Sequence, residues 1–177
     1  MAASFNTDLM EQVGDCVSDE VRAKYNEYVK QGFTDIYQGL SVCGPVLNIV
    51  RDPRWGRVPE TYGEDPYLTS RMGVTYVKAL QAQGVSACPK HFCCNNKEVN
   101  RKESDSRVSE RALREIYLRA FEYPVRKGGA KAIMTSYNRL NGVYTPNSYD
   151  LLTKVLRNEW GFDGVVMTDW FSTNKGQ

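Results

Sequence analysis

The chain contains 177 residues, of which 41% are hydrophobic and 25% charged, and its formal net charge is +2. This composition predicts a soluble globular protein with enough apolar material for one core, and the weak positive charge, not gathered into any basic run, indicates no nucleic-acid partner. No apolar stretch approaches the ~18 residues that a membrane span needs, and the first residues lack a signal-peptide pattern, so we expect no membrane partner.

The first predicted element is a helix over about residues 8 to 30. Thr7 can cap its N-terminus, and Gly32 ends it. Apolar residues recur at helical spacing along one face, which we expect to be buried. This face comprises Leu9, Val13, Cys16, Val17, Val21, Tyr25, Tyr28 and Val29.

The first predicted strand lies within residues 40–50 and leads into a polar loop over residues 51–60. A second helix opens at Asp65-Pro66, with proline at the first helical position. Its inner stripe comprises Leu68, Met72, Thr75, Tyr76, Ala79 and Leu80. Two groups of nearby charges have structural interpretations: ion pairs that brace the loop, and carboxylates at the positive end of the helix. They are Arg51, Asp52 and Arg54, and Glu64 and Asp65, respectively.

Gly84 turns the chain into a second strand over residues 85–92, and a long polar loop follows over residues 93–108. Ser109 is expected to cap a third helix that ends at Lys127-Gly128-Gly129. Arg101, within the polar loop, can be either a structural anchor or a support for nearby functional side chains.

A third strand is expected over residues 132–136, followed by a turn at Asn141-Gly142. Either Ser148 or Asn147 can cap a fourth helix. The last strand, over residues 163–168, has the length and apolar character of a fully buried strand.

The cysteines form no metal-binding pattern. There are five of them beside a single histidine, and the adjacent pair Cys93-Cys94 is not a zinc-ligand spacing. We therefore expect no metal and no cofactor. Free thiols favour a reducing compartment such as the cytoplasm, and the sequence leaves the location otherwise unknown. The cysteines are Cys16, Cys43, Cys88, Cys93 and Cys94.

Four strands that alternate with helices predict an α/β fold with a parallel sheet. Each strand ends in polar side chains, which is typical of the catalytic face of a (β/α)₈ barrel of the TIM type, and no glycine-rich phosphate loop favours a doubly wound sheet. A complete barrel takes ~250 residues. The chain supplies about four strand–helix units plus an N-terminal helix, so we expect a partial barrel cut from a larger enzyme.

Five short motifs in this order resemble glycoside hydrolase family 3. They are Arg51-Asp52-Pro53-Arg54-Trp55-Gly56-Arg57, Gly63-Glu64-Asp65-Pro66-Tyr67, Lys90-His91-Phe92, Met134-Thr135-Ser136-Tyr137-Asn138 and Met167-Thr168-Asp169-Trp170. The resemblance implies a (β/α)₈-type domain followed by an α/β sandwich domain, in retaining enzymes that remove a terminal sugar from the non-reducing end of β-linked glycosides. Residues 1–177 would then be an incomplete first domain, without the second.

The resemblance also implies roles for single residues. Asp169 matches the nucleophile, which forms a covalent glycosyl intermediate. The expected sugar-binding residues are Arg57, Lys90, His91, Tyr137 and Trp170. Lys90 and His91 would donate hydrogen bonds to hydroxyls, and their charge would keep Asp169 ionised. Because neighbours on a regular strand point to opposite faces, the backbone at this pair must be irregular for both to reach one sugar. On its own stretch of sequence, Asp169 has a simpler interpretation as a helix cap, and Trp170 as a core residue.

No residue matches the acid/base of the family. Glu60, Glu98 and Glu103 are candidates by residue type alone. The β-N-acetylhexosaminidase branch is excluded because it uses a second histidine, which this chain lacks. The remaining motifs favour a β-glucosidase acting on a β-linked glucoside or short oligosaccharide, with a β-xylosidase as the alternative.

A protein of another class also fits the sequence, namely a non-catalytic carbohydrate-binding or assembly module. In either case, we expect open sheet edges that invite self-association or a complementary chain that completes the barrel. The isolated chain is expected to have little or no glycosidase activity.

Overall fold

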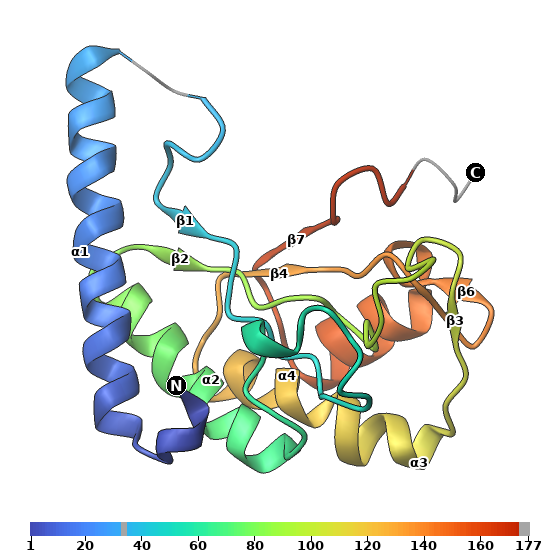
Figure 1. Ribbon diagram of the computed structural model, residues 1–177. Coiled ribbons are helices and arrows are strands. Elements are labelled where there is room, and N and C mark those ends of the chain that lie inside the picture. Colours follow the sequence, from blue (N-terminus) through green and yellow to red (C-terminus); the bar gives the residue numbers. More distant parts are fainter. Residues whose placement is uncertain (33–34, 174–177) are drawn as a thin grey trace.

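The computed structural model describes residues 1–32 and 35–173. Helices and short parallel strands alternate along the chain, and the helices pack around the strands (Figure 1). The helical elements are η1 (Ala2–Ser4), α1 (Thr7–Gln31), η2 (Val58–Glu60), α2 (Pro66–Ala82), α3 (Glu110–Ala112), η3 (Leu113–Tyr117), α4 (Arg119–Arg126), η4 (Thr145–Asn147) and η5 (Asp150–Glu159). The strands are β1 (Ser41–Val42), β2 (Ser86–Ala87), β3 (Asp105–Ser106), β4 (Ala132–Met134), β5 (Arg139–Leu140), β6 (Val143–Tyr144) and β7 (Val165–Met167).

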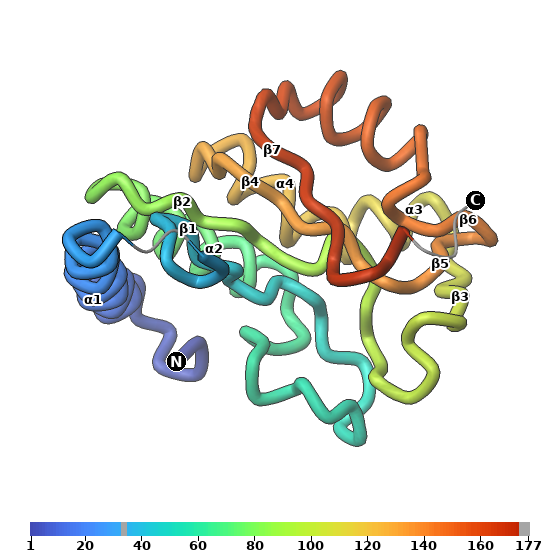
Figure 2. The backbone as a smooth tube through the Cα atoms, turned by 90° about the horizontal axis from the view of Figure 1, so that it is seen from above, coloured from blue at the N-terminus to red at the C-terminus, as the bar shows by residue number. Residues whose placement is uncertain are grey.

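Two pairs of parallel strands, β1–β2 and β4–β7, form the sheet wall that organises the molecule. β1 pairs in parallel with β2, and β4 pairs in parallel with β7. Beyond the strands themselves, single parallel bridges join Val46 to Lys90 and Phe92 to Thr135. Neighbours in the sheet are therefore consecutive strand–helix units, as in a barrel wall. In the described ranges the wall is open, because β1 and β7 each pair on one side only (Figure 2).

The N-terminal helix α1 begins one residue earlier than expected. Its cap is Asn6 rather than Thr7, because the Asn6 side chain accepts hydrogen bonds from the backbone N–H groups of Asp8 and Leu9. Gly32 ends the helix with φ of 75°, as expected.

The face that α1 buries also differs from the expected one. Met10, Gly14 and Ser18 are its buried residues, and they pack toward α2. Of the expected apolar stripe, Leu9, Cys16 and Val29 are exposed and the others half-buried. Small residues lie at the contact because the two helices approach closely: a Cβ atom added to Gly14 would lie 2.5 Å from the Cβ of Ala79.

The second helix, α2, begins as expected. Asp65 caps it by accepting a hydrogen bond from the backbone N–H of Tyr67 at 2.8 Å, and Pro66 occupies its first position. Met72, Ala79 and Leu80 of the expected stripe are buried. The helix thereby covers one face of β2.

The third and fourth helices follow the expected caps. Ser109 accepts a hydrogen bond from the N–H of Ala112, and one helical run continues from α3 through the π-helical turn η3 into α4. Ser148, one of the two expected caps, accepts a hydrogen bond from the N–H of Leu151 at 3.2 Å, in the first turn of the helical run that contains η5.

The polar loop over residues 93–108 contains an element that we did not predict. Within it, β3 pairs in parallel with β5, and β5 pairs with β6 around the turn at Asn141-Gly142. Both turn residues have positive φ, 50° and 94°, which is typical of a tight hairpin. Through the pairing of β3 with β5, this three-stranded sheet fixes the position of the loop that follows the Lys90-His91 segment.

The last strand is shorter and more exposed than expected. β7 has three residues instead of the six predicted, and Val165 is 64% exposed. The prediction of a fully buried strand was wrong. Within the described ranges, β7 pairs with β4 alone, and the other edge of β7 has no neighbouring strand.

The main core lies under the carboxyl ends of the strands. Phe92 is fully buried, and its ring lies 5.2 Å from that of Phe121 and 5.7 Å from that of Trp160. Because Phe92 directly follows His91, this packing anchors the segment that carries the candidate site. None of the helices in residues 1–32 and 35–173 combines the length and apolar character that a membrane crossing requires.

Candidate functional site

One pocket of about 340 Å³ opens at the carboxyl ends of β1, β2, β4 and β7. All six side chains that the sequence assigned to a sugar site line it: Arg57, Lys90, His91, Tyr137, Asp169 and Trp170. Four more residues complete the lining, namely Tyr37, Cys43, Arg101 and Met134. The strands therefore bring together groups that lie more than a hundred residues apart in the sequence.

Lys90 and His91 both face this pocket although they are sequence neighbours. The segment is not a regular strand, because β2 ends at Ala87 and the chain beyond it is held by single bridges at Lys90 and Phe92. The expectation of irregular backbone at this pair is therefore confirmed.

His91 is buried, with 2% of its surface exposed. Its Nδ1 lies 3.0 Å from Oδ1 of Asn48, and its Nε2 lies 3.7 Å from Oδ2 of Asp169. Burial, and then the positive charges of Arg57, Lys90 and Arg101, lower the pKa of His91 to about 2. The imidazole is thus neutral near pH 7, so the expectation that its charge keeps Asp169 ionised was wrong.

Arg57 is held on two sides. Its Nε and Nη2 donate to the two carboxylate oxygens of Glu60 at 2.9 and 2.7 Å, and its Nη1 lies 3.1 Å from Nε2 of His91. The hydrogen bonds from Arg57 lower the pKa of Glu60. The guanidinium is therefore fixed at the pocket wall as a charged donor.

Tyr137 is 6% exposed and lies between cations and the Asp169 carboxylate. The guanidinium carbon of Arg101 lies 4.6 Å from the centre of its ring, and Nζ of Lys102 lies 5.2 Å from it. Burial raises the pKa of Tyr137, and the charge of Asp169 and a hydrogen bond with it act in the same direction. The phenol thus remains protonated and can donate to Asp169.

Asp169 is 9% exposed at the base of the pocket. Its Oδ1 accepts a hydrogen bond from the backbone N–H of Trp170 at 2.8 Å, which leaves Oδ2 directed toward the His91 side. A carboxylate held in this way, with cationic side chains around it, can act as a nucleophile toward a bound carbon centre.

Trp170 forms part of the pocket mouth rather than the core, since it is 48% exposed. Its ring stacks on that of Tyr37, with centres 6.0 Å apart and planes 22° from parallel. Sequence reasoning missed Tyr37, which precedes β1 and carries no motif.

Several charges of the surrounding loops are paired. Arg54 bonds Asp52 at 2.6 Å, which confirms the bracing role expected for this pair. Glu98 accepts from Arg101 at 2.8 Å and from the indole N–H of Trp55 at 3.2 Å. Arg101 therefore has both of the roles considered for it, because Glu98 anchors it while it lines the pocket beside Tyr137.

The described part of the chain holds no group of three or more His, Cys, Asp or Glu side chains that could bind a metal ion. The cysteines are free thiols there, with Cys88, Cys93 and Cys94 buried. Burial raises the pKa of Cys88 to about 12. This thiol is therefore not ionised near neutral pH.

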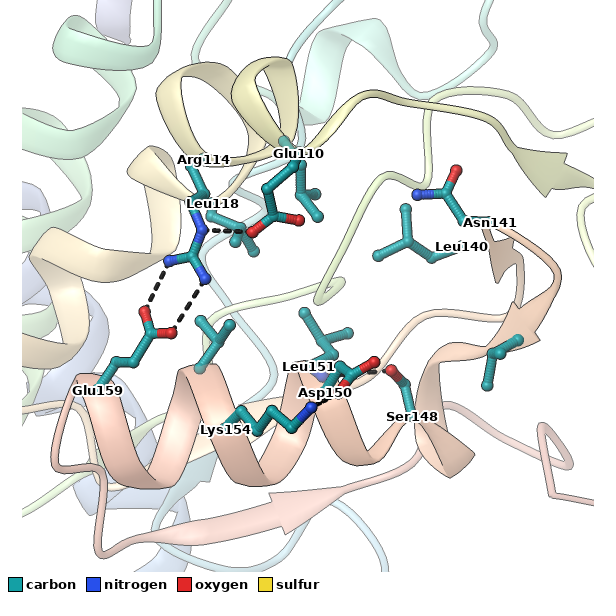
Figure 3. A pocket seen from close by; sticks show the side chains of 13 residues that line it. Glu110, Arg114, Leu118, Leu140, Asn141, Ser148, Asp150, Leu151, Lys154 and Glu159 are labelled. Atoms are coloured by element: carbon teal, nitrogen blue, oxygen red, sulfur yellow. Dashed lines mark hydrogen bonds and ion pairs between the residues drawn. The ribbon is translucent and has the colours of Figure 1, made fainter.

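A second pocket, of about 350 Å³, lies away from these residues, between the α3–η3 segment and η5 (Figure 3). Its floor is apolar, and its charged rim is largely neutralised: Arg114 bonds both Glu110 and Glu159, and Lys154 bonds Asp150. The first pocket is the better candidate site, because its polar groups converge on one carboxylate.

A comparison with protein families identifies the family of the chain. The family model described as "Glycosyl hydrolase family 3 N terminal domain" matches residues 1–176. The chain therefore belongs to glycosyl hydrolase family 3, and the resemblance inferred from the five motifs is confirmed.

Several named relatives are similar over nearly the whole chain. A beta-glucosidase of Rhizobium radiobacter is 45% identical over 175 residues, which are 98% of this chain and 20% of the relative. An exo-alpha-(1->6)-L-arabinopyranosidase of Bifidobacterium longum is 43% identical over 171 residues, 96% of this chain and 21% of the relative. The chain thus spans about a fifth of the length of these relatives.

Solved structures show the same fold. Beta-glucosidase 3B from Thermotoga neapolitana in complex with glucose matches with a TM-score of 0.86 and 46% identity, covering 96% of this chain and 22% of that one. A beta-glucosidase from Kluyveromyces marxianus in complex with glucose matches with a TM-score of 0.88 and 41% identity, covering 97% and 19%. The predicted α/β fold of partial-barrel type is therefore confirmed. Within the described ranges, the strands form part of a barrel wall that is not closed.

Proposed function

We propose that this chain carries the nucleophile and the sugar-binding side of the active site of a retaining exo-β-glycosidase of the β-glucosidase type. In this proposal, Asp169 attacks the anomeric carbon of a terminal non-reducing sugar and forms a covalent glycosyl intermediate. Arg57, Lys90, His91 and Tyr137 hold the sugar, and Trp170 forms a wall of the subsite.

One observation carries the proposal. Residues from the ends of four separate strand units surround a single pocket, and Oδ2 of Asp169 lies 3.7 Å from Nε2 of His91. Charged and hydrogen-bonding side chains around one buried carboxylate suit a ligand with several hydroxyl groups. The family and the names of the relatives support the same chemistry.

The acid/base is the group that we do not assign within this chain. A retaining glycosidase needs a second carboxyl group ~5–5.5 Å from the nucleophile. In residues 1–32 and 35–173, Asp169 is the one carboxylate that lines the pocket, while Glu60 and Glu98 are each bonded to an arginine. We propose that the acid/base comes from another part of a longer enzyme, with residues 1–177 as part of its first domain.

The identity of the sugar is a finer part of the proposal. The similar relatives include both a beta-glucosidase and an enzyme named for L-arabinopyranoside, a sugar that lacks the exocyclic hydroxymethyl group of glucose. Glucose is our first choice because two of the matching structures hold it. A pentopyranoside is the second choice.

The test uses the purified chain and two leaving groups. We expect slow release of 2,4-dinitrophenol from its β-glucoside and no hydrolysis of methyl β-glucoside, because general acid catalysis is worth ~10²–10⁴-fold for a leaving group that needs a proton. Asp169→Asn should abolish the aryl reaction, whereas Asp163→Asn, outside the pocket, should not. The rates of 2,4-dinitrophenol release from the corresponding β-xyloside and α-L-arabinopyranoside, compared with the β-glucoside, show which sugar is preferred.

Robust turnover of both glucosides would place the acid/base within residues 1–177 and contradict this assignment. If the chain neither turns over the aryl glucoside nor binds glucose, the non-catalytic assembly module becomes the better description.

A further inference from the structure

Asn48 is a buried polar residue in the apolar segment that follows β1. The residue is 2% exposed, and the three polar contacts of its side chain within the described residues are all with His91. Its Nδ2 donates to the His91 backbone carbonyl at 2.8 Å. Its Oδ1 accepts from the His91 backbone N–H at 2.9 Å and lies 3.0 Å from the ring Nδ1. Sequence reasoning gave this residue no role.

The backbone of His91 fixes which way the Asn48 amide points. A backbone N–H can only donate and a backbone carbonyl can only accept, so Oδ1 and Nδ2 of Asn48 cannot be exchanged. The atom near the ring is therefore an acceptor. Nδ1 of His91 must carry a proton to bond it, which leaves the lone pair of the neutral ring on Nε2.

The other side of the ring leads to the same assignment independently. Arg57 Nη1 lies 3.1 Å from Nε2 of His91, and a guanidinium can only donate. Two donors cannot share this short contact, so Nε2 has no proton. The charged groups that face the ring are the cations of Arg57, Lys90 and Arg101 and the carboxylate of Asp169.

We propose that Asn48 is a positioning residue that holds His91 as the Nδ1-protonated tautomer and thereby makes Nε2 a hydrogen-bond acceptor in the pocket. If the pocket binds a sugar as proposed above, a hydroxyl of the sugar takes the place of Arg57 Nη1 and donates a hydrogen bond to Nε2, which frees Nη1 to donate to the ligand. Lys90 and Arg57 are donors to the ligand, and His91 and Asp169 are acceptors. The two donors would bind sugar hydroxyls that accept a hydrogen bond, and the two acceptors would bind hydroxyls that donate one.

His91 is the only histidine of the chain, so its ring nitrogens need no assignment. The test is a long-range ¹H–¹⁵N correlation spectrum of the full chain, labelled with ¹⁵N-histidine, between about pH 8 and about pH 5. We expect a pyrrole-type shift for Nδ1 and a pyridine-type shift for Nε2 throughout. A proton on Nε2 at neutral pH, in either the neutral or the charged ring, would overturn the proposal.

Two variants test whether Asn48 sets this state. Asn48→Leu removes the acceptor at Nδ1, and we expect the proton to move at least in part to Nε2, where it bonds Asp169, 3.7 Å away, as the contact with Arg57 is given up. Asn48→Asp retains an acceptor for Nδ1, so the tautomer should be kept while the ring begins to titrate within the pH range. Asn138→Asp is the matched control, since Asn138 is equally buried but bonds Cys93, Ser106 and Arg139 instead. Unchanged ring shifts in Asn48→Asp, or in a folded Asn48→Leu, would show that Asn48 does not control the ring.

Adding glucose separates this proposal from the proposed function. Binding to the wild-type chain should move the Nε2 resonance, and Asn48→Leu should weaken glucose binding about tenfold, as expected for one hydrogen bond. If glucose does not bind but the tautomer is as stated, the proposed function fails while the role of Asn48 stands. If glucose binds and Nε2 carries the proton, the role of Asn48 fails.

Discussion

His91 shows how a single buried side chain couples the candidate site to the stability of the fold. Its pKa is lowered to about 2 by burial and by three nearby cations, whereas an exposed histidine has a pKa of ~6.5. Between these values the unfolded chain binds a proton that the folded chain does not. The free energy of unfolding must therefore fall as the pH decreases through this window, and His91 adds nothing to the pH dependence above it.

The first prediction follows from this fall of the unfolding free energy at low pH. At about pH 5, the contribution of His91 to the slope of the unfolding free energy should approach about 1.4 kcal/mol per pH unit. His91→Gln should remove this slope while it retains a side chain of similar size. The measurement is urea unfolding of both proteins at a series of pH values. Parallel curves for the wild type and His91→Gln below pH ~6.5 would show that the imidazole is not held neutral.

At the scale of elements, the contact between α1 and α2 depends on one missing side chain. A Cβ atom at Gly14 would lie 2.5 Å from the Cβ of Ala79, which is closer than two such atoms can approach. Ser18 strengthens the same contact, because its hydroxyl donates to the Leu80 carbonyl at 3.1 Å. The interface is therefore close-packed and specific rather than simply apolar.

The second prediction is that Gly14→Ala destabilises the chain by about 1–3 kcal/mol through overpacking, although alanine is the better helix former. Gly39→Ala is the control, because nothing lies within 4 Å of the added Cβ. Chemical denaturation of both variants measures the difference. A stabilised Gly14→Ala protein would mean that α1 does not pack on α2 as described.

The contact between α1 and α2 also shows which parts of the fold can be predicted from the sequence. Periodicity and caps located α1, α2 and the later helices because these signals are local. The buried face of α1 was misjudged, since Gly14 and Ser18 are favoured by the distance to a neighbouring helix, which the sequence alone does not state. Strand β3 was missed because its pairing with β5, far along the chain, determines its structure.

For the candidate site, residues within motifs could be named in advance, and residues that support them could not. Asp169, Lys90 and Arg57 stand in recognisable motifs, and their roles remain predictions. Asn48 carried one usable signal, an amide within the apolar run of residues 46–50, where a buried polar group needs a partner. Tyr37 carried none, because its stacking on Trp170 depends on the tertiary fold.

For the whole molecule, the open sheet has a consequence in solution. The outer side of β7 is unpaired within the described ranges, and Val165 on it is 64% exposed. Unpaired backbone groups beside an exposed apolar side chain favour pairing with another chain. We infer that the isolated chain self-associates through this edge, or through a complementary chain that completes the barrel.

The third prediction concerns this association and uses a substitution at Val165. Val165→Lys places a charge on the edge and should shift the purified chain toward the monomer, whereas Val99→Lys, at another exposed valine, should not. Sedimentation velocity at several protein concentrations gives the distribution of species. A wild-type chain that stays monomeric at all concentrations would contradict the inference.

The central claim is that Asp169 is a nucleophile within a sugar pocket, and covalent trapping tests it most directly. The reagent is 2-deoxy-2-fluoro-β-glucosyl fluoride, whose leaving group needs little protonation, so that an acid/base outside this chain is not required. Oδ2 of Asp169 would form a bond to the anomeric carbon as fluoride departs, and the fluorine at C2 would slow hydrolysis of the ester. Intact mass spectrometry followed by peptide mapping should show one added fluoroglucosyl group, on Asp169, and none in Asp169→Asn. A label on another residue, or an equal label in Asp169→Asn, would contradict the account.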